Sequence, residues 1–365
     1  MEKKATLKLL EWYDAHRRIL PWREDPTPYH VWVSEIMLQQ TRVEVGIGYY
    51  ERFIAELPDV KALAQVSEER LMKLWQGLGY YSRARNLHRA AQMIVDCGSF
   101  PETREELLKL PGVGAYTAGA ILSIAFQKPF IAPDGNAYRV AARLTADDGV
   151  LEERATQKRL EEVLQGALST ERPGAFNQAL MDLGSGVCLA HGRPRCDACP
   201  LSDDCQAFAL GNAEELPRRR AKAERKVEHK NVYILRRHGK VLLVKRPKNG
   251  LLAGLWGLPL EEREAEEGTG TPPSGSALAE GISLGRHRHV FSHVTWQMDG
   301  YLYDDDGGGY GEGDGMPSFA SECVKEASEG YVWADPRDLE TVYSVPAAFW
   351  PFLTRAQASE STQKG

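Results

Sequence analysis

Residues 110–117 read Leu-Pro-Gly-Val-Gly-Ala-Tyr-Thr, and an apolar run follows them. Pro111, Gly112 and Gly114 interrupt helical structure, because proline lacks an amide donor and glycine adopts conformations that a side chain forbids. A new helix is expected over 115–125, so the stretch predicts a tight hairpin between two helices. Its unpaired amides offer a site for an anion such as a DNA phosphate. The alternative is a helix connection that binds no ligand.

An acidic residue stands downstream of this hairpin. Pro133-Asp134-Gly135-Asn136 opens a further apolar helix. Hairpin, spacing and acid together resemble the helix-hairpin-helix motif of the base-excision DNA glycosylases. The resemblance implies an all-α domain whose hairpin glycines, Gly112 and Gly114, contact DNA.

Two carboxylates have contrasting surroundings. Glu35 is the one acid in a largely apolar helix that begins near Pro28. Burial disfavours a charge, so its pKa is expected to rise, as a general acid near neutral pH requires. Asp134 precedes a helix N-terminus, which favours its charged form. Such a pair suits cleavage of an N-glycosidic bond. The alternatives are a Glu35 that faces water or pairs with Arg42, and an Asp134 that is a plain N-cap.

The segment around Glu35 is more specific. Residues 32–41 read Trp-Val-Ser-Glu-Ile-Met-Leu-Gln-Gln-Thr and resemble the matching motif of the MutY family of adenine DNA glycosylases. The resemblance implies that Glu35 protonates adenine at N7, and that Gln40 and Thr41 insert at the lesion pair. Similar matches at 21–23, 176–180 and 77–83 imply further contacts. These are Trp22, Arg23 and Gln178 near the flipped adenine, and Leu78 and Tyr80 beside the opposing base.

Tyr116 separates two branches of this superfamily. Endonuclease III-type enzymes carry a lysine two residues after the second hairpin glycine, and its amine forms the Schiff base for strand cleavage. A phenol cannot form an imine, so we predict a monofunctional glycosylase in which Tyr116 and Asn136 hydrogen-bond around Asp134. Thymine glycosylases of G·T mismatches also carry tyrosine there, so this residue alone does not fix the base.

Four cysteines close the helical region, and they are Cys188, Cys196, Cys199 and Cys205. Such a set is better explained by a metal than by disulfides in a cytosolic chain, and its spacing does not choose between zinc and iron–sulfur. Its position resembles the 4Fe-4S loop of the endonuclease III and MutY branch, although the first gap is one residue longer than usual. The resemblance implies a structural 4Fe-4S cluster that presents Arg193 and Arg195 to phosphates. Cys97 and Cys323 are expected to be ordinary residues.

In the second half of the chain, the pattern of apolar residues changes from helical spacing to the alternation typical of strands. Alternating strands around His238-Gly239 predict a β-hairpin. Residues 251–259 resemble the segment before the catalytic box of Nudix hydrolases, but the box itself is missing. This implies a Nudix-like fold without hydrolase activity, which in the MutY family recognises 8-oxoguanine. The loop Phe291, Ser292 and His293 matches the residues at that lesion, and an ordinary strand end is the alternative.

We therefore expect a multidomain chain. An all-α helix-hairpin-helix glycosylase domain at 1–211 includes the iron–sulfur loop at 188–205, and a basic linker spans 212–230. An α+β Nudix-like domain follows at 231–355, and the tail at 356–365 is expected to be mobile. Residues 261–280 and 304–315 are rich in Gly, Glu, Asp, Ser and Pro and are expected to be surface loops.

Charge and hydropathy limit the partners. A net charge of −6 argues against a generally basic surface. Because the acidic excess lies mainly after residue 225, a DNA-binding face must be local, with candidates at Arg83, Arg85 and Arg89 and in the run 218–226. Neither a signal peptide nor a membrane span is expected. The chain is expected to be a cytoplasmic monomer, associated with the nucleoid in a bacterium.

The resemblance implies an adenine DNA glycosylase of base excision repair. Its partner would be duplex DNA that contains adenine opposite 8-oxoguanine or guanine. Three alternatives stay open: a G·T-mismatch thymine glycosylase, a non-catalytic sensor of 8-oxoguanine, and a Nudix-type nucleotide hydrolase, which the missing box disfavours.

Overall fold

The computed structural model describes residues 3–221, 224–264, 281–304 and 330–363. The chain divides into two compact units. One comprises Met1–Val66 with Ser82–Lys222, and the other comprises Ser67–Tyr81 with Ala223–Gly365. Of the helices that fall within these ranges, none has the length and apolar character needed to cross a membrane.

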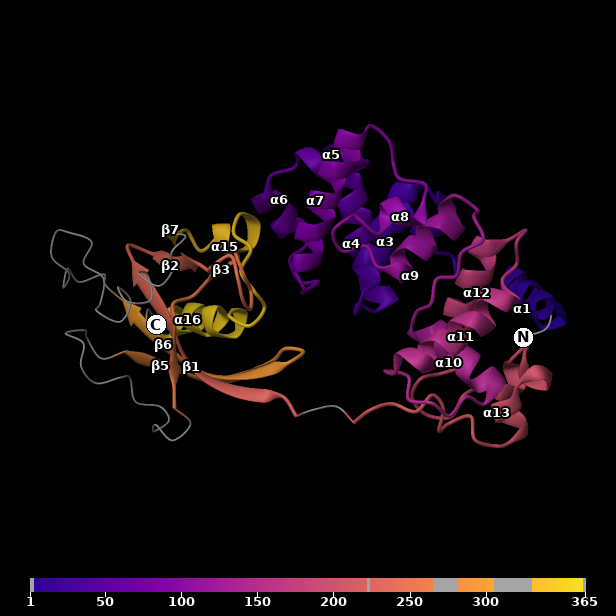
Figure 1. Ribbon diagram of the computed structural model, residues 1–365. Coiled ribbons are helices and arrows are strands. Elements are labelled where there is room, and N and C mark those ends of the chain that lie inside the picture. The colour runs from indigo at the N-terminus through magenta and orange to yellow at the C-terminus, as the bar shows by residue number, and fades with distance from the viewer. Residues whose placement is uncertain (1–2, 222–223, 265–280, 305–329, 364–365) are drawn as a thin grey trace. The chain divides into compact units, whose positions relative to one another are not determined.

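The first unit is helical, as predicted (Figure 1). Its helices are α1 (Lys3–His16), α2 (Pro21–Glu24), α3 (Pro28–Leu38), α4 (Val43–Glu56), α5 (Val60–Gln65), α7 (Ser82–Cys97), α8 (Arg104–Leu107), α9 (Ala115–Ala120), α10 (Gly135–Thr145), α11 (Arg154–Ala167), α12 (Pro173–Gly186) and α13 (Gln206–Ala209). Short 3-10 turns lie at Cys196–Ala198 and Ser202–Asp204.

Helices α1, α10, α11 and α12 share one core. Leu9, Val140, Leu160 and Phe176 are buried there, one from each helix. Burial of such side chains contributes roughly 1.5–3 kcal/mol each. This core fixes α10 against α12, and these two helices carry several of the predicted site residues.

The predicted hairpin is present. Gly112 adopts a φ of +79°, and Gly114 is the N-cap of α9. The predicted helix over 115–125 is only partly α-helical, since α9 ends at Ala120 and a π-helical turn covers Ile121–Ala125. A Cβ on Gly119 would stand 2.0 Å from the carbonyl oxygen of Ile131. A glycine is therefore needed there to let α9 lie against the segment that leads into Asp134.

The second unit is built on a seven-stranded sheet. Its strands are β1 (Lys226–Arg237), β2 (Lys240–Lys245), β3 (Trp256–Gly257), β4 (Leu260–Arg263), β5 (Ile282–Val290), β6 (Val294–Asp304) and β7 (Tyr331–Ala334). The order is β3-β2-β1-β6-β5, with β4 paired to β1 and β7 paired to β2. Helices α6 (Glu68–Leu74), α15 (Asp338–Thr341) and α16 (Trp350–Gln363) belong to this unit. The predicted β1–β2 hairpin is confirmed by the pairing of Arg237 with Lys240.

Helix α16 packs on the sheet through Phe352, Leu353 and Ala356. Within the segment predicted to be a mobile tail, the backbone is helical as far as Gln363, and Ala356 at its start is buried. A Cβ on Gly300 of β6 would stand 2.2 Å from Phe352, so only glycine leaves room for this ring.

Two boundaries also differ from the sequence-based expectation. Strand β1 begins at Lys226, inside the predicted linker, because it pairs in parallel with β6 along its length. The predicted loop at 261–280 is strand as far as Arg263, because β4 pairs with β1. The rest of that loop from 265, and residues 305–315, lie outside the described residues.

Candidate active site

Glu35 lies inside the protein. Helix α3 begins at Pro28, where the Thr27 side chain accepts a hydrogen bond from the His30 amide, and most of its residues are buried. The Glu35 side chain is among them, at 7% exposure. Burial raises the pKa of Glu35 to about 7, while the hydrogen bond from Tyr116 acts in the opposite direction. The expected protonated acid is therefore supported over a glutamate that faces water or Arg42.

Asp134 is the N-cap of α10. Its Oδ1 accepts a hydrogen bond from the Ala137 amide at 2.7 Å, and its Oδ2 accepts one from Asn136 Nδ2 at 2.7 Å. The expectation of a lowered pKa is wrong, because burial raises the pKa of Asp134 by more than these hydrogen bonds lower it. The helix terminus thus offsets only part of the cost of desolvation.

Tyr116 has a different partner from the predicted one. Its hydroxyl donates a hydrogen bond to Oε2 of Glu35, rather than one to Asp134. Burial raises the pKa of the phenol well above its ordinary value, and the nearby Glu35 and Asp134 carboxylates act in the same direction. Tyr116 is therefore a permanent hydrogen-bond donor, carried to the acid by the hairpin that precedes α9.

Both carboxylates face one cavity of about 210 Å³. Eight predicted residues line this cavity, which we call the acid pocket. They are Trp22, Arg23, Glu35, Thr41, Tyr116, Asp134, Asn136 and Gln178. Segments distant in sequence therefore converge on one cavity.

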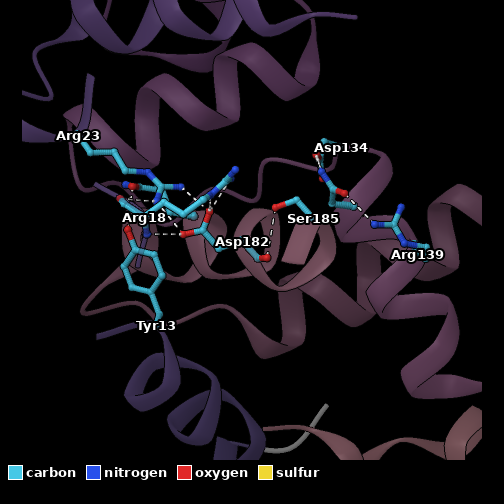
Figure 2. Close-up of polar contacts among 9 residues, drawn as sticks. Tyr13, Arg18, Arg23, Asp134, Arg139, Asp182 and Ser185 are labelled. Atoms are coloured by element: carbon cyan, nitrogen blue, oxygen red, sulfur yellow. Dashed lines mark hydrogen bonds and ion pairs between the residues drawn. The ribbon is translucent and has the colours of Figure 1, made fainter. Parts of the chain in front are cut away.

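Asp182 organises one wall of the acid pocket, and the sequence analysis did not single it out. Its carboxylate binds Arg23 through both oxygens, at 2.7 and 3.0 Å, and also accepts a 2.7 Å hydrogen bond from Arg18 Nε (Figure 2). The side chain is 2% exposed. Although burial pushes its pKa upward, the two guanidiniums hold the pKa of Asp182 below its usual range. A lone acid four residues after Gln178 on an apolar helix was the available signal.

Gln178 is oriented by a tyrosine. Tyr13 of α1 donates a 2.9 Å hydrogen bond to Oε1 of Gln178. With its carbonyl oxygen engaged, the amide of Gln178 is left to present its N–H donors to the pocket.

Asn136 connects the acid pocket to the cysteine loop. Its Oδ1 accepts a 2.8 Å hydrogen bond from Arg139, whose Nε donates to the carbonyl oxygen of Cys188 at 2.8 Å. Arg143, one turn later on α10, donates to Sγ of Cys188 at 3.1 Å. Figure 2 labels Asp134 and Arg139, the two residues that Asn136 joins through its hydrogen bonds.

The four predicted cysteines lie together. All four line one small cavity, with Arg143 beside them. Burial raises the pKa of Cys199 to about 12, so a thiolate there needs a compensating positive charge. Within the described ranges, no group of three or more His, Cys, Asp or Glu side chains is arranged to hold a single metal ion. Cys97 is exposed, and Cys323 lies outside the described residues.

Gln40 stands just beyond the end of α3. It is exposed and has a φ of +60°, a conformation uncommon for residues other than glycine. Thr41 turns back to line the acid pocket. Arg83, a predicted DNA-binding residue, is instead buried, because its guanidinium donates to carbonyl groups of the α3 terminus.

The second unit brings together the residues expected at the opposing base. The hydroxyls of Tyr80 and Ser292 are hydrogen-bonded to each other. Tyr80 is 44% exposed, and Ser292 and His293 are exposed in the turn between β5 and β6. The ring of Phe291 packs edge-to-face on the ring of Trp296, at 4.9 Å between centroids. Leu78 is buried nearby in the chain.

Comparisons with known proteins fit this arrangement. Residues 33–165 match the HhH-GPD superfamily of base excision DNA repair proteins, and residues 231–355 match the NUDIX domain. The predicted order of a helical glycosylase-type domain and a Nudix-like sheet domain is thereby confirmed.

Several relatives are similar over most of this chain. An adenine DNA glycosylase of Arabidopsis thaliana is 35% identical over 80% of this chain and 56% of its own length. One of Mus musculus is 35% identical over 80% of this chain and 69% of its own, and one of Schizosaccharomyces pombe is 33% identical over 78% of each. The chain thus spans little more than half the length of the plant relative. A solved thermostable thymine-DNA glycosylase has 25% identity and a TM-score of 0.51, covering 57% of this chain and 97% of that one.

Proposed function

This chain belongs to the adenine DNA glycosylase family of base excision repair, and from that premise we propose that it hydrolyses the N-glycosidic bond of adenine mispaired with 8-oxoguanine or guanine. The substrate is duplex DNA, bound by a monomer. The proposal rests on the acid pocket, where a Glu35 with a raised pKa and a hydrogen-bonded Asp134 line the same cavity.

The chemistry follows from the two carboxylates. Glu35 gives its proton to N7 of the flipped adenine, which turns the base into a neutral leaving group. The bond between C1′ and N9 breaks, and the electron pair leaves with the base. Asp134, held by Asn136 and the Ala137 amide, supports the positive charge on the sugar. Water then bonds to C1′ and loses a proton to solvent.

Two pocket residues supply recognition of the base. Arg23, fixed by Asp182, and Gln178, fixed by Tyr13, present N–H donors at set positions. Extruding a base costs a few kcal/mol, less for a mispair, and Gln40 offsets this cost by filling the vacated space. Tyr116 has no amine, so strand cleavage through a Schiff base is not expected.

The second unit recognises the lesion in this proposal. Tyr80 and Ser292 are hydrogen-bonded to each other, and His293 is exposed beside Ser292. These polar groups suit the edge of an oxidised guanine. The missing hydrolase box argues against hydrolysis of free nucleotides by this domain.

We propose that Cys188, Cys196, Cys199 and Cys205 hold a 4Fe-4S cluster with a structural role. All four cysteines line one small cavity, and thiolate sulfur is the ligand that such a cluster takes from a protein. Arg143 would help to balance the thiolate charge. Iron and sulfide analysis of the anaerobically purified protein tests this, with Cys199→Ser expected to lose iron and Cys97→Ser expected to keep it. Zinc in place of iron would refute it.

A single-turnover assay tests the activity. Duplexes would carry A opposite 8-oxoguanine, A opposite G, A opposite T, or T opposite G. Abasic product from the first two alone, revealed only after alkali, is the expected result. Product from T opposite G would indicate the thymine branch, and binding without product would indicate a lesion sensor.

A further inference from the structure

Arg83 lies at the C-terminal end of α3, the helix that carries Glu35. It is in the first turns of α7 and is 9% exposed. Its Nη1 donates to three carbonyl oxygens at the end of α3, those of Ile36 at 2.8 Å, Met37 at 3.0 Å and Gln39 at 2.5 Å. The last carbonyls of a helix have no partners inside it, and a cation beside them is favoured by the helix dipole.

The backbone changes direction immediately after these carbonyls. Gln39 is the C-cap, and Gln40 follows with a φ of +60°. Thr41 returns toward the helix, since its amide donates to the Leu38 carbonyl at 3.2 Å. A glutamine in the left-handed region is held there by its surroundings, and such residues gather at functional sites. Gln40 is exposed and directly precedes Thr41, which lines the acid pocket.

We infer that Arg83 is a positioning residue for DNA insertion: by holding the terminal carbonyls of α3, it keeps Gln40 in the conformation that enters the base stack. This inference rests on the proposed function. All three hydrogen bonds come from one nitrogen of the guanidinium, so the end of α3 requires a cation with N–H donors at that point. Arg83 therefore serves extrusion of the base, whereas Glu35 and Tyr116 serve the chemistry.

The base analogue 2-aminopurine fluoresces when it is unstacked, so its fluorescence measures base extrusion separately from excision. In a Glu35→Gln background, a duplex with 2-aminopurine opposite 8-oxoguanine is expected to brighten on binding. Adding Arg83→Met is expected to remove most of that rise at saturating protein. Adding Arg154→Met, at an arginine of α11 whose side chain is 77% exposed, is expected to leave it unchanged. An equal rise with and without Arg83 would overturn the inference.

Excision gives a second readout. Arg83→Met is expected to slow single-turnover excision from a paired duplex by about tenfold, but to change it little for adenine in a one-nucleotide bulge, where stacking is already weakened. Arg83→Lys, which keeps a cation with N–H donors, is expected to recover part of the loss. The bulge substrate also corrects for any inactive fraction of the variant. An equal loss on both substrates, or an Arg83→Lys no better than Arg83→Met, would show a general structural role instead. If the wild type released adenine from neither substrate, the proposed function would fail first.

Discussion

The hydroxyl of Tyr116 donates a hydrogen bond to the carboxylate of Glu35, although the two residues lie 81 positions apart in the chain. This hydrogen bond connects α9, which follows the hairpin, to α3, which carries Glu35. The bond favours the charged form of Glu35, and burial favours the neutral form more strongly. The acid is therefore poised near neutral pH.

Turnover is expected to fall as the pH rises through about 7, because Glu35 must be protonated to act and its pKa is about 7. The single-turnover rate constant on A opposite 8-oxoguanine, measured between pH 5 and 9, should lose about tenfold per unit on the alkaline side. Glu35→Gln should abolish most turnover and retain DNA binding. A flat profile, or a Glu35→Gln variant with full activity, would contradict the assignment of the acid.

Tyr116→Phe is expected to move this alkaline limb to higher pH. Removing the hydroxyl takes away a hydrogen bond that lowers the pKa of Glu35, so the carboxyl keeps its proton longer. The same pH series measures the effect. A limb that moves to lower pH would mean that Tyr116 does not favour the charged form.

Glu35→Gln is also expected to stabilise the protein at alkaline pH. The folded state holds the proton of Glu35 up to about pH 7, whereas an unfolded glutamate loses it near 4.5, so wild-type stability falls as the pH rises across that window. The full window corresponds to roughly 3 kcal/mol. Denaturant unfolding at pH 5 and pH 8 should show an advantage of the variant that grows with pH. An advantage that is the same at both values would exclude this origin.

Gly184→Ala is expected to lower turnover strongly. A Cβ at this position would stand 2.5 Å from Cβ of Asn136, which donates to Asp134. Gly186→Ala in the same helix is the matched control, because no atom outside its own helix neighbourhood lies within 4 Å of its added Cβ. Single-turnover rates and unfolding midpoints of both variants provide the comparison. Equal rates would mean that Asn136 tolerates displacement.

Alanine substitutions at the two hairpin glycines are expected to have different effects on stability. Gly112 has a φ of +79°, and its added Cβ would lie 2.9 Å from Cβ of Asn86, so Gly112→Ala should cost about 1–2 kcal/mol of stability. Gly114 has an extended backbone and open space around it, so Gly114→Ala should leave stability nearly unchanged. If a phosphate approaches this hairpin, Gly114→Ala should still weaken DNA binding. Denaturant unfolding and a salt titration of binding separate the two effects, and wild-type affinity in Gly114→Ala would argue against a phosphate there.

Some features were predictable because their causes are local. The hairpin depends on Gly112 and Gly114, the start of α3 on Thr27 and Pro28, and the β1–β2 turn on His238-Gly239. In each case a few adjacent residues restrict the backbone. The four-cysteine loop was predictable in the same way, because its cysteines lie close together in the chain.

Other features were not predictable because they depend on distant segments. The strand at Leu260–Arg263 exists because it pairs with β1, despite a composition typical of loops. Asp182 carries no motif of its own, and its role comes from its contact with Arg23 on α2. Arg83 was expected to face DNA, and only the fold places it against the end of α3.

The sequence by itself determined where the chain turns and which side chains could act as acids or metal ligands. It also determined that Glu35 would lie in an apolar helix. Only the tertiary structure decided that Tyr116 binds Glu35 rather than Asp134, and that burial raises the pKa of Asp134 despite its place at a helix start. The reason is physical. Backbone preferences act between neighbours in the chain, whereas desolvation and hydrogen bonding depend on which groups the fold brings together in space.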